Sequence, residues 1–215
     1  MFSVRVSPDL LADLYEAGTT GIIEHDGEIE AFFDDEAVAA RFGEPHRSED
    51  VDYVAQTEAA WPPLLVGTKF FLVAPWRTEP TPPGRFRLVI NPGLQCGTGQ
   101  HPCTQKCLEA LERLVRPRDS VLDVGSGSGI LSLAARLLGA GRVVACDLDP
   151  DAEKPVPFFV GSADAVRSNS FDIVVANINE EVLDGPLRAE LERVAPKRIL
   201  SGFQDEHGDW TCVVA

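Results

Sequence analysis

Apolar positions change their spacing across a glycine-rich turn in the middle of the chain. Ser120 to Val124 is a short apolar run with a single acid, which is typical of a strand buried on both faces of a parallel sheet. From Ile130 to Leu138 the apolar residues follow helical spacing, and Gly139 is placed to end the helix. The pattern therefore predicts a strand, a tight turn and a helix.

Further apolar runs on both sides of this unit predict more elements of a parallel sheet. Gly185-Pro186 should interrupt the helix expected at 180–194. Residues 149–157 are too few for a helical crossover, which predicts a loop there. The expected strands are 86–90, 142–147, 158–160, 171–177, 198–203 and 210–215, and the expected helices are 107–115 and 180–194. The fold class predicted for this part is α/β with a mostly parallel sheet.

The first part of the chain has a different order of elements. Asp26-Gly27 lies between two alternating runs and is a strong hairpin signal, and Ser7 and Pro8 suit the start of a helix. The order β-α-β-β-α-β predicts a small ferredoxin-like α+β module. Its expected strands are 2–6, 21–25, 28–33 and 51–57, and a second helix is expected at 37–42. A further apolar run, 70–73, comes just before a stretch rich in proline. We therefore predict domains at 1–75 and 85–215, joined by a stiff connector at 76–84.

The alternate glycines Gly125, Gly127 and Gly129 point to a bound ligand, because residues without Cβ reach unusual φ/ψ and allow close approach to the backbone. A dinucleotide fingerprint would require glycine at position 130, which is Ile. Asp147 closes the next strand and is placed to accept hydrogen bonds from ribose hydroxyls. The alternatives are glycines that serve only the turn and a carboxylate that is merely solvated.

The loop at 91–104 is rich in glycine, proline and polar side chains, which favours a functional role. His101 either forms hydrogen bonds within this loop or takes part directly in chemistry. Thr104 is either a ligand contact or only a helix N-cap. Asn177 ends a buried strand at its carboxyl end, where open α/β sheets bind ligands.

Composition narrows the classes of partner and of site. The formal net charge is −15, so a nucleic-acid backbone is not expected to bind, whereas a basic protein would be attracted; the alternative is that acidity only maintains solubility. The sequence has neither an apolar run near the ~20 residues of a membrane span nor a signal peptide, and its five cysteines are an odd number. A cytoplasmic protein with reduced thiols is expected. Cys96, His101, Cys103 and Cys107 lack the C-x2-C spacing of structural zinc sites, so no metal is expected.

With these features in view, the chain resembles the ribosomal protein L11 methyltransferase family. Residues 91–94 (N-P-G-L) and 97–104 (G-T-G-Q-H-P-C-T) are similar to the family's D-P-G-x-x-F-G-T-G-x-H-x-T-T. The G-x-G-x-G turn with Asp123 upstream resembles the first motif of Rossmann-like S-adenosylmethionine (SAM) methyltransferases. The resemblance implies a domain that recognises the ribosomal protein, a flexible linker and a SAM-dependent catalytic domain.

The resemblance also implies roles for particular residues. Thr104 and Asn177 would line the methyl-transfer site and contact SAM, and no general base is assigned. The full expected cofactor-binding set is Thr104, Asp123, Gly125, Gly127, Gly129, Asp147, Asp164 and Asn177. The expected reaction is methylation of lysine and of N-terminal amines on L11, a basic protein substrate.

The sequence departs from the family pattern at several places. Asn91 replaces the family's Asp and Cys103 replaces the first Thr of its pair. Residues 149–157 stand where the family has a helix, and 204–209 stand where it has a helix and a strand. These features indicate a shortened member. Two alternatives remain open: methylation of another protein lysine or of a small molecule, and a SAM-binding or purely interacting module that has lost catalysis.

Overall fold

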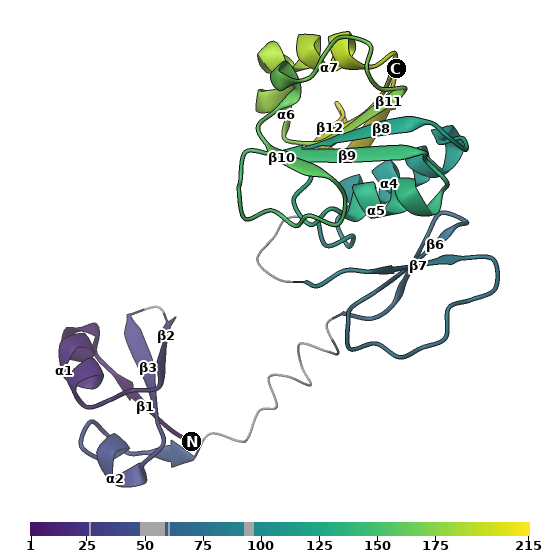
Figure 1. Cartoon of the computed structure of the whole chain (residues 1–215). Helices are drawn as coiled ribbons and strands as arrows, with labels where there is room; N and C mark the ends of the chain where they lie inside the picture. Colours follow the sequence, from purple (N-terminus) through teal and green to yellow (C-terminus); the bar gives the residue numbers. More distant parts are fainter. Residues whose placement is uncertain (26, 48–58, 60, 93–96) are drawn as a thin grey trace. The chain divides into compact units, whose positions relative to one another are not determined.

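A computed structural model describes residues 1–25, 27–47, 59, 61–92 and 97–215 (Figure 1). The chain divides into two compact units, Met1–Ala60 and Trp61–Ala215. Each unit has its own apolar core, and the glycine turn belongs to the second. Among the helices of the described ranges, none combines the length and the apolar character that a transmembrane span requires.

The first unit is a four-stranded antiparallel sheet in the order β2-β3-β1-β4. Its elements are β1 (Phe2–Val6), η1 (Pro8–Leu10), α1 (Leu11–Glu16), β2 (Gly21–His25), β3 (Glu28–Phe33), α2 (Glu36–Ala39) and β4 (His46–Arg47). Ser7 and Asp35 accept hydrogen bonds as N-caps of the helical turns. The described elements follow a β-α-β-β-α-β order in which the fourth strand is the short β4, and not the predicted one. The strand predicted at 51–57 lies outside the described residues.

The second unit is built on a six-stranded sheet in the order β10-β9-β8-β11-β12-β13, in which only β13 runs antiparallel to its neighbour. The strands are β8 (Ser120–Val124), β9 (Arg142–Asp147), β10 (Phe158–Val160), β11 (Ile173–Asn177), β12 (Lys197–Gln204) and β13 (Trp210–Val214). The predicted α/β class with a mostly parallel sheet is therefore confirmed. The carboxyl ends of β8, β9 and β11 lie together at one end of the sheet, where the glycine turn begins.

Helices cover both faces of this sheet (Figure 1). On one face lie α4 (Pro102–Leu114) and α5 (Ile130–Leu137); on the other lie η2 (Ala163–Ala165), α6 (Glu180–Val182), the π-helical η3 (Leu183–Leu187) and α7 (Arg188–Val194). Gly185 in η3 has non-helical dihedral angles, and Pro186 follows it. The predicted interruption of the later helix is thus confirmed. The helix predicted to begin at Cys107 begins earlier, at Pro102.

A small separate sheet, in the order β5-β6-β7, packs on the outer side of α4 and α5. It consists of β5 (Leu64–Val66), β6 (Phe70–Val73) and β7 (Phe86–Val89), and β6 runs parallel to β7. Residues 76–84 therefore connect two strands of one sheet. The two units separate between residues 60 and 61 and not at 76–84, because β6 is buried against α4 and α5 of the second unit. Arg87 holds this crossover by donating hydrogen bonds to the carbonyls of Arg77 and Glu79.

Both shortened connections are loops, as predicted. The segment between β9 and β10 contains no helix, although Ala152 and Val156 are buried. The segment between β12 and β13 is a tight turn, in which the Asp205 carboxylate accepts hydrogen bonds from the backbone N–H groups of His207 and Asp209 at 2.9 and 3.0 Å. As a result, β13 pairs directly with β12 and forms one edge of the sheet.

Candidate functional site

The glycine turn is as tight as its sequence predicts. Gly125, Gly127 and Gly129 have φ of 69°, 49° and 69°, which side-chain-bearing residues rarely adopt. The N–H groups of Gly125 and Ser126 donate to the carbonyl of Cys146 at 2.9 and 3.2 Å, so the turn closes over the end of β9. Gly129 then begins α5, whose first residues are buried. Hydrogen bonds to β9 and the buried start of α5 thus hold the backbone of the turn.

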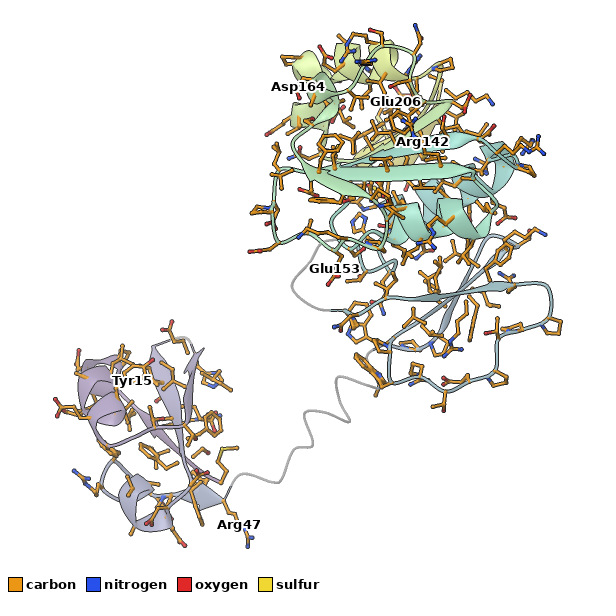
Figure 2. All side chains as sticks on the ribbon, in the orientation of Figure 1. Tyr15, Arg47, Arg142, Glu153, Asp164 and Glu206 are labelled. Carbon is orange, nitrogen blue, oxygen red and sulfur yellow. The ribbon has the colours of Figure 1, made fainter. Side chains whose placement is uncertain are left out.

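The short connector after β9 also packs against this turn. The N–H of Glu153 donates to the carbonyl of Gly127 at 2.9 Å, and a Cβ on Gly129 would overlap the ring of Pro155. Figure 2 labels Glu153 on this connector. A cleft of about 670 Å³ opens beside it, lined by the connector, Ser128, Leu133 and the end of β7. The connector therefore supports the turn, where the family pattern has a helix.

Asp147 lies where the sequence predicts, at the carboxyl end of β9. Its two carboxylate oxygens accept hydrogen bonds from the N–H groups of Gly127 at 2.9 Å and Asp149 at 3.0 Å. The side chain is only partly buried. Each carboxylate oxygen can accept more than one hydrogen bond, so the carboxylate is held in place and retains the capacity to accept hydroxyl donors. The alternative of a merely solvated carboxylate does not describe this contact with the glycine turn.

Asp123 occupies a different position from the one expected of a ligand contact. Its side chain is 1% exposed, and its carboxylate accepts a hydrogen bond of 2.6 Å from the hydroxyl of Ser132 on α5. Burial is the main cause that raises the pKa of Asp123 to about 6; the hydrogen bonds from Ser132 oppose this and the charge of Asp147 adds to it. Asp123 therefore ties α5 to β8, and we propose that it positions the turn through Ser132.

This raised pKa predicts a specific pH dependence of stability. The folded state binds more protons at Asp123 than the unfolded state between pH 3.8 and about 6, so this residue's contribution to the free energy of unfolding falls as pH rises through that window and is flat above it. Asp123→Asn should abolish that fall and stabilise the protein by roughly 1–3 kcal/mol at pH 7.5, with little difference near pH 4. Urea denaturation at several pH values measures this.

Asp172→Asn is the matched control for that experiment. Hydrogen bonds from the Ser120 hydroxyl and N–H lower the pKa of Asp172, so its contribution is lost as pH falls and its replacement should destabilise above pH 4. Equal slopes for wild type and Asp123→Asn would contradict the assignment for Asp123.

Thr104 and Asn177 meet although they are far apart in the sequence. The side-chain amide of Asn177 donates to the hydroxyl of Thr104 at 3.1 Å, and Thr104 is 1% exposed. Thr104 is not the N-cap of α4. That role belongs to His101, whose Nδ1 accepts a hydrogen bond from the N–H of Cys103 at 3.3 Å. Of the two alternatives for His101, the local hydrogen bond is the one observed, and the ring also contacts Trp210 edge-on, with centroids 4.5 Å apart.

Asp164 lies on η2, beyond the end of β10, and is exposed (Figure 2). Arg193 on α7 holds this short helix by donating to the carbonyl of Ala163 at 3.1 Å. Burial, together with the charges of Asp123, Asp147 and Asp164, raises the pKa of the Cys146 thiol to about 12. The three acids therefore gather around the end of β9. Within the described residues no group of three His, Cys, Asp or Glu side chains is placed to hold a metal ion; Cys96 lies outside that range.

Two serines of the turn were not predicted to act at the site. The hydroxyl of Ser126 is buried and has no hydrogen-bond partner within the described part of the chain, which is costly unless a ligand supplies one. The hydroxyl of Ser128 donates to the carbonyl of Gly97 at 2.6 Å and so joins the turn to the loop. The only sequence signal for either was its place between alternate glycines.

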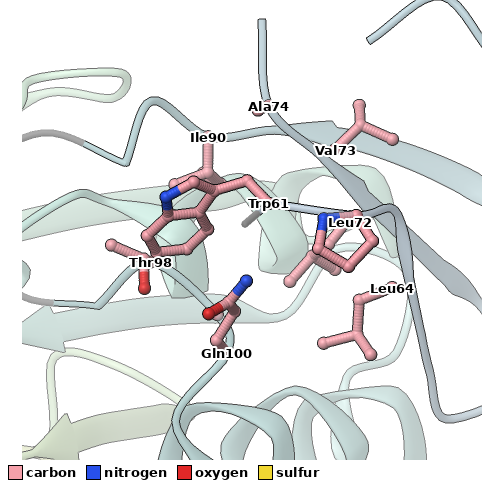
Figure 3. A pocket seen from close by; sticks show the side chains of 10 residues that line it. Trp61, Leu64, Leu72, Val73, Ala74, Ile90, Thr98 and Gln100 are labelled. Carbon is pink, nitrogen blue, oxygen red and sulfur yellow. The ribbon is translucent and has the colours of Figure 1, made fainter. Parts of the chain in front are cut away.

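The part of the 91–104 loop that comes just before α4 packs against the small sheet. Thr98, Gly99 and Gln100 line a small apolar pocket with residues of β6 and with Trp61 (Figure 3). Gly99 has φ of 90°, and its Cα faces Leu72 of β6 and Ile130 of α5. Residues 93–96 of the predicted functional loop lie outside the described residues. The small sheet thus supports the loop that leads into His101 and Thr104.

Gly202 fixes the backbone beside Asn177. It has φ of 106°, and a Cβ there would overlap the backbone of Ile178. Gly202→Ala should destabilise the fold by about 2–5 kcal/mol, the sum of positive-φ strain and steric overlap. Gly208→Ala is the control, because Gly208 has φ of 82° and open space around it; we expect it to cost about 1–2 kcal/mol. Equal losses in denaturant titrations would show that Ile178 does not limit this position.

Comparison with known proteins agrees with this arrangement. Residues 23–208 match the family model described as ribosomal protein L11 methyltransferase (PrmA). The chain is 39% identical over 170 residues to the ribosomal protein L11 methyltransferase of Burkholderia pseudomallei (strain 668), covering 75% of this chain and 55% of the relative. The Methylobacillus flagellatus protein of the same name is 33% identical over 207 residues, covering 88% and 69%.

A solved structure shares the fold. The crystal structure of ribosomal protein L11 methylase from Lactobacillus delbrueckii subsp. bulgaricus aligns with a TM-score of 0.57 and 30% identity, covering 66% of this chain and 80% of that chain. The chain spans about half the length of the first curated relatives it matches. Taken together, the match of the family model to most of the sequence and the shared fold show that the chain belongs to the ribosomal protein L11 methyltransferase family.

Proposed function

We propose that this chain is a SAM-dependent protein N-methyltransferase that modifies lysine and N-terminal amines of ribosomal protein L11. One observation carries the proposal. The hydrogen-bonded pair of Asn177 and Thr104 lies at the carboxyl end of the parallel strands, as does the glycine turn that holds the carboxylate of Asp147. The names of the relatives support the choice of substrate. The proposed compartment is the cytoplasm.

The residues present fit SAM as the cofactor. Asp147 would accept hydrogen bonds from the ribose hydroxyls, and the positive-φ turn would admit the cofactor close to the backbone. The unpartnered hydroxyl of Ser126 supports a polar ligand at this turn. Asp164 and Thr104 complete the proposed binding set. When bound, SAM supplies a methyl group made electrophilic by the sulfonium.

Asn177 and Thr104 are proposed to orient the amine that receives the methyl group. Because the amide N–H of Asn177 donates to Thr104, its amide oxygen remains able to accept a hydrogen bond from an amine. The near-complete burial of Thr104 fixes this orientation. A lysine amine has a pKa near 10.4 and an α-amine near 8, so the substrate must lose a proton before it reacts. Positioning and exclusion of water then provide most of the acceleration.

The charge distribution supports a basic partner for the first unit. Residues 1–60 contain fifteen Asp and Glu against three Lys and Arg, so this unit carries −12 of the chain's net charge of −15. This negative charge speeds the encounter with a basic protein, and added salt weakens the attraction. We propose that this unit attracts the ribosomal protein, as the family resemblance implies.

Transfer of labelled methyl groups tests this function. The full chain, incubated with methyl-labelled SAM and purified L11, should label L11, and the label should fall when the L11 lysines are replaced by arginine and its N-terminus is blocked. Unlabelled L11 would contradict the proposal. Label on another protein or on small molecules of a cell extract would favour the alternative substrates, and SAM binding without any transfer would favour the interaction module.

A further inference from the structure

The open edge of β13 offers backbone hydrogen-bonding groups to another strand. Arg198 and Ala215 exchange both backbone hydrogen bonds, at 2.8 and 3.0 Å, so alternate residues of β13 face β12. The N–H and C=O groups of Cys212 and Val214 therefore point away from β12, toward the edge. Val213 and Val214 are 40% and 45% exposed. Across the described residues, no strand pairs with this side of β13.

β13 itself lacks the features that usually prevent strand pairing; the register shift in its ladder with β12, between Ser201 and Phe203, lies on β12. Natural edge strands carry charges, proline or bulges, or are very short. β13 has the sequence Trp-Thr-Cys-Val-Val, with no charge, glycine or proline in five residues. The opposite edge strand of the same sheet, β10, has only three residues. The two edges therefore differ, and β13 is the one suited to pairing.

The charges around β13 match a second copy of the same edge. The turn at one end holds Asp205, Glu206 and Asp209, all exposed, and Figure 2 labels Glu206 there. The other end lies beside Lys197 and Arg198 of β12. Antiparallel pairing about a two-fold axis would bring the acidic turn of each copy toward the basic end of the other. A parallel partner would instead align like charges.

We infer that β13 pairs with β13 of a second copy, in an antiparallel register centred on Val213, to form a sheet continuous across a two-fold dimer. In this register Cys212 of one copy lies opposite Val214 of the other, and the N–H and C=O groups of these two residues are hydrogen-bonded between the copies. The two Val213 side chains meet at the axis as a non-hydrogen-bonded pair, where cross-strand side chains approach most closely. This association goes beyond the proposed reaction and does not require it.

Sedimentation of the full chain from about 1 to about 200 µM tests this inference, because dimers of moderate affinity dissociate within that range. A concentration-dependent dimer is expected. Val213→Lys, which places two ammonium groups together at the axis, should raise the dissociation constant roughly 100-fold. The matched control is Val160→Lys on the opposite edge strand, β10, where the valine is 58% exposed. This substitution should leave the dissociation constant unchanged.

Cross-linking tests the register and decides the matter if Val213→Lys does not fold. The Cα atoms of a non-hydrogen-bonded antiparallel pair are about 4.5 Å apart, within the range that a disulfide spans. Val213→Cys, oxidised by glutathione disulfide, should form a covalent dimer to a much greater extent than wild type or Val160→Cys. A monomer at all concentrations, a dimer that survives Val213→Lys, or equal cross-linking by the two cysteine variants would overturn the inference.

Discussion

Replacing Asn177 by alanine is expected to lower kcat for methylation of L11 roughly 100- to 1,000-fold, the usual cost of losing a positioned polar group at a reaction centre. The change removes the amide that would hold the amine and leaves the buried hydroxyl of Thr104 without its donor. The Kd for SAM should change about 10-fold or less, because Asp147 and the turn remain. Steady-state kinetics with labelled SAM, together with calorimetry, separate the two effects.

Two further variants show whether this loss is specific. Asn179→Ala removes the same side chain two residues away, where it is exposed and forms no capping hydrogen bond, and should leave kcat unchanged. Thr104→Ser keeps the hydroxyl and should retain most activity, whereas Thr104→Val should behave like Asn177→Ala. A kcat for Asn177→Ala within a factor of about 3 of wild type would rule out positioning by this pair.

Asp147→Ala should weaken SAM binding about 10- to 100-fold, since hydrogen bonds to a charged group contribute roughly 1.5–3 kcal/mol each. Part of this loss comes from the turn itself, because the carboxylate also accepts the N–H of Gly127 at 2.9 Å. Isothermal titration calorimetry measures the change.

Asp149→Ala is the control for Asp147. Asp149 is an exposed acid in the connector after β9, and its carboxylate accepts the local N–H of Asp151 at 2.8 Å. It should bind SAM as the wild type does. Equal weakening by both variants would indicate a general effect of acidic charge rather than contact with the ribose.

Much of the second unit could be predicted from sequence because its strands are buried on both faces. The strand at 142–147 and the helix start at Ile130 were predicted at the observed residues, since the apolar run of the strand follows Gly141 and the helical spacing begins directly after Gly129. The family resemblance was confirmed by the family model and the relatives. The loop in place of a helix at 149–157 followed from its length alone.

The errors come from contacts between distant segments. Prolines at 75–84 indicated a boundary, but β6 pairs with β7 across them, and sequence does not report a pairing of that kind. The helix predicted to begin at Cys107 begins at Pro102, so its N-cap is His101. The burial of Asp123 against Ser132 and the unpartnered Ser126 hydroxyl likewise depend on packing that spacing alone does not reveal.

Binding of SAM to the unsubstituted chain is the measurement that tests the central claim most directly, since every role proposed for the glycine turn, Asp147, Thr104 and Asn177 requires it. Calorimetric titration of the full chain should show one SAM per chain, with a Kd in the range of about 1–100 µM. That result would show that the chain binds the cofactor although a short connector packs against the glycine turn in place of the family's helix. No saturable heat up to about 1 mM SAM, in protein shown to be folded, would contradict the account and leave a purely interacting module that does not bind SAM.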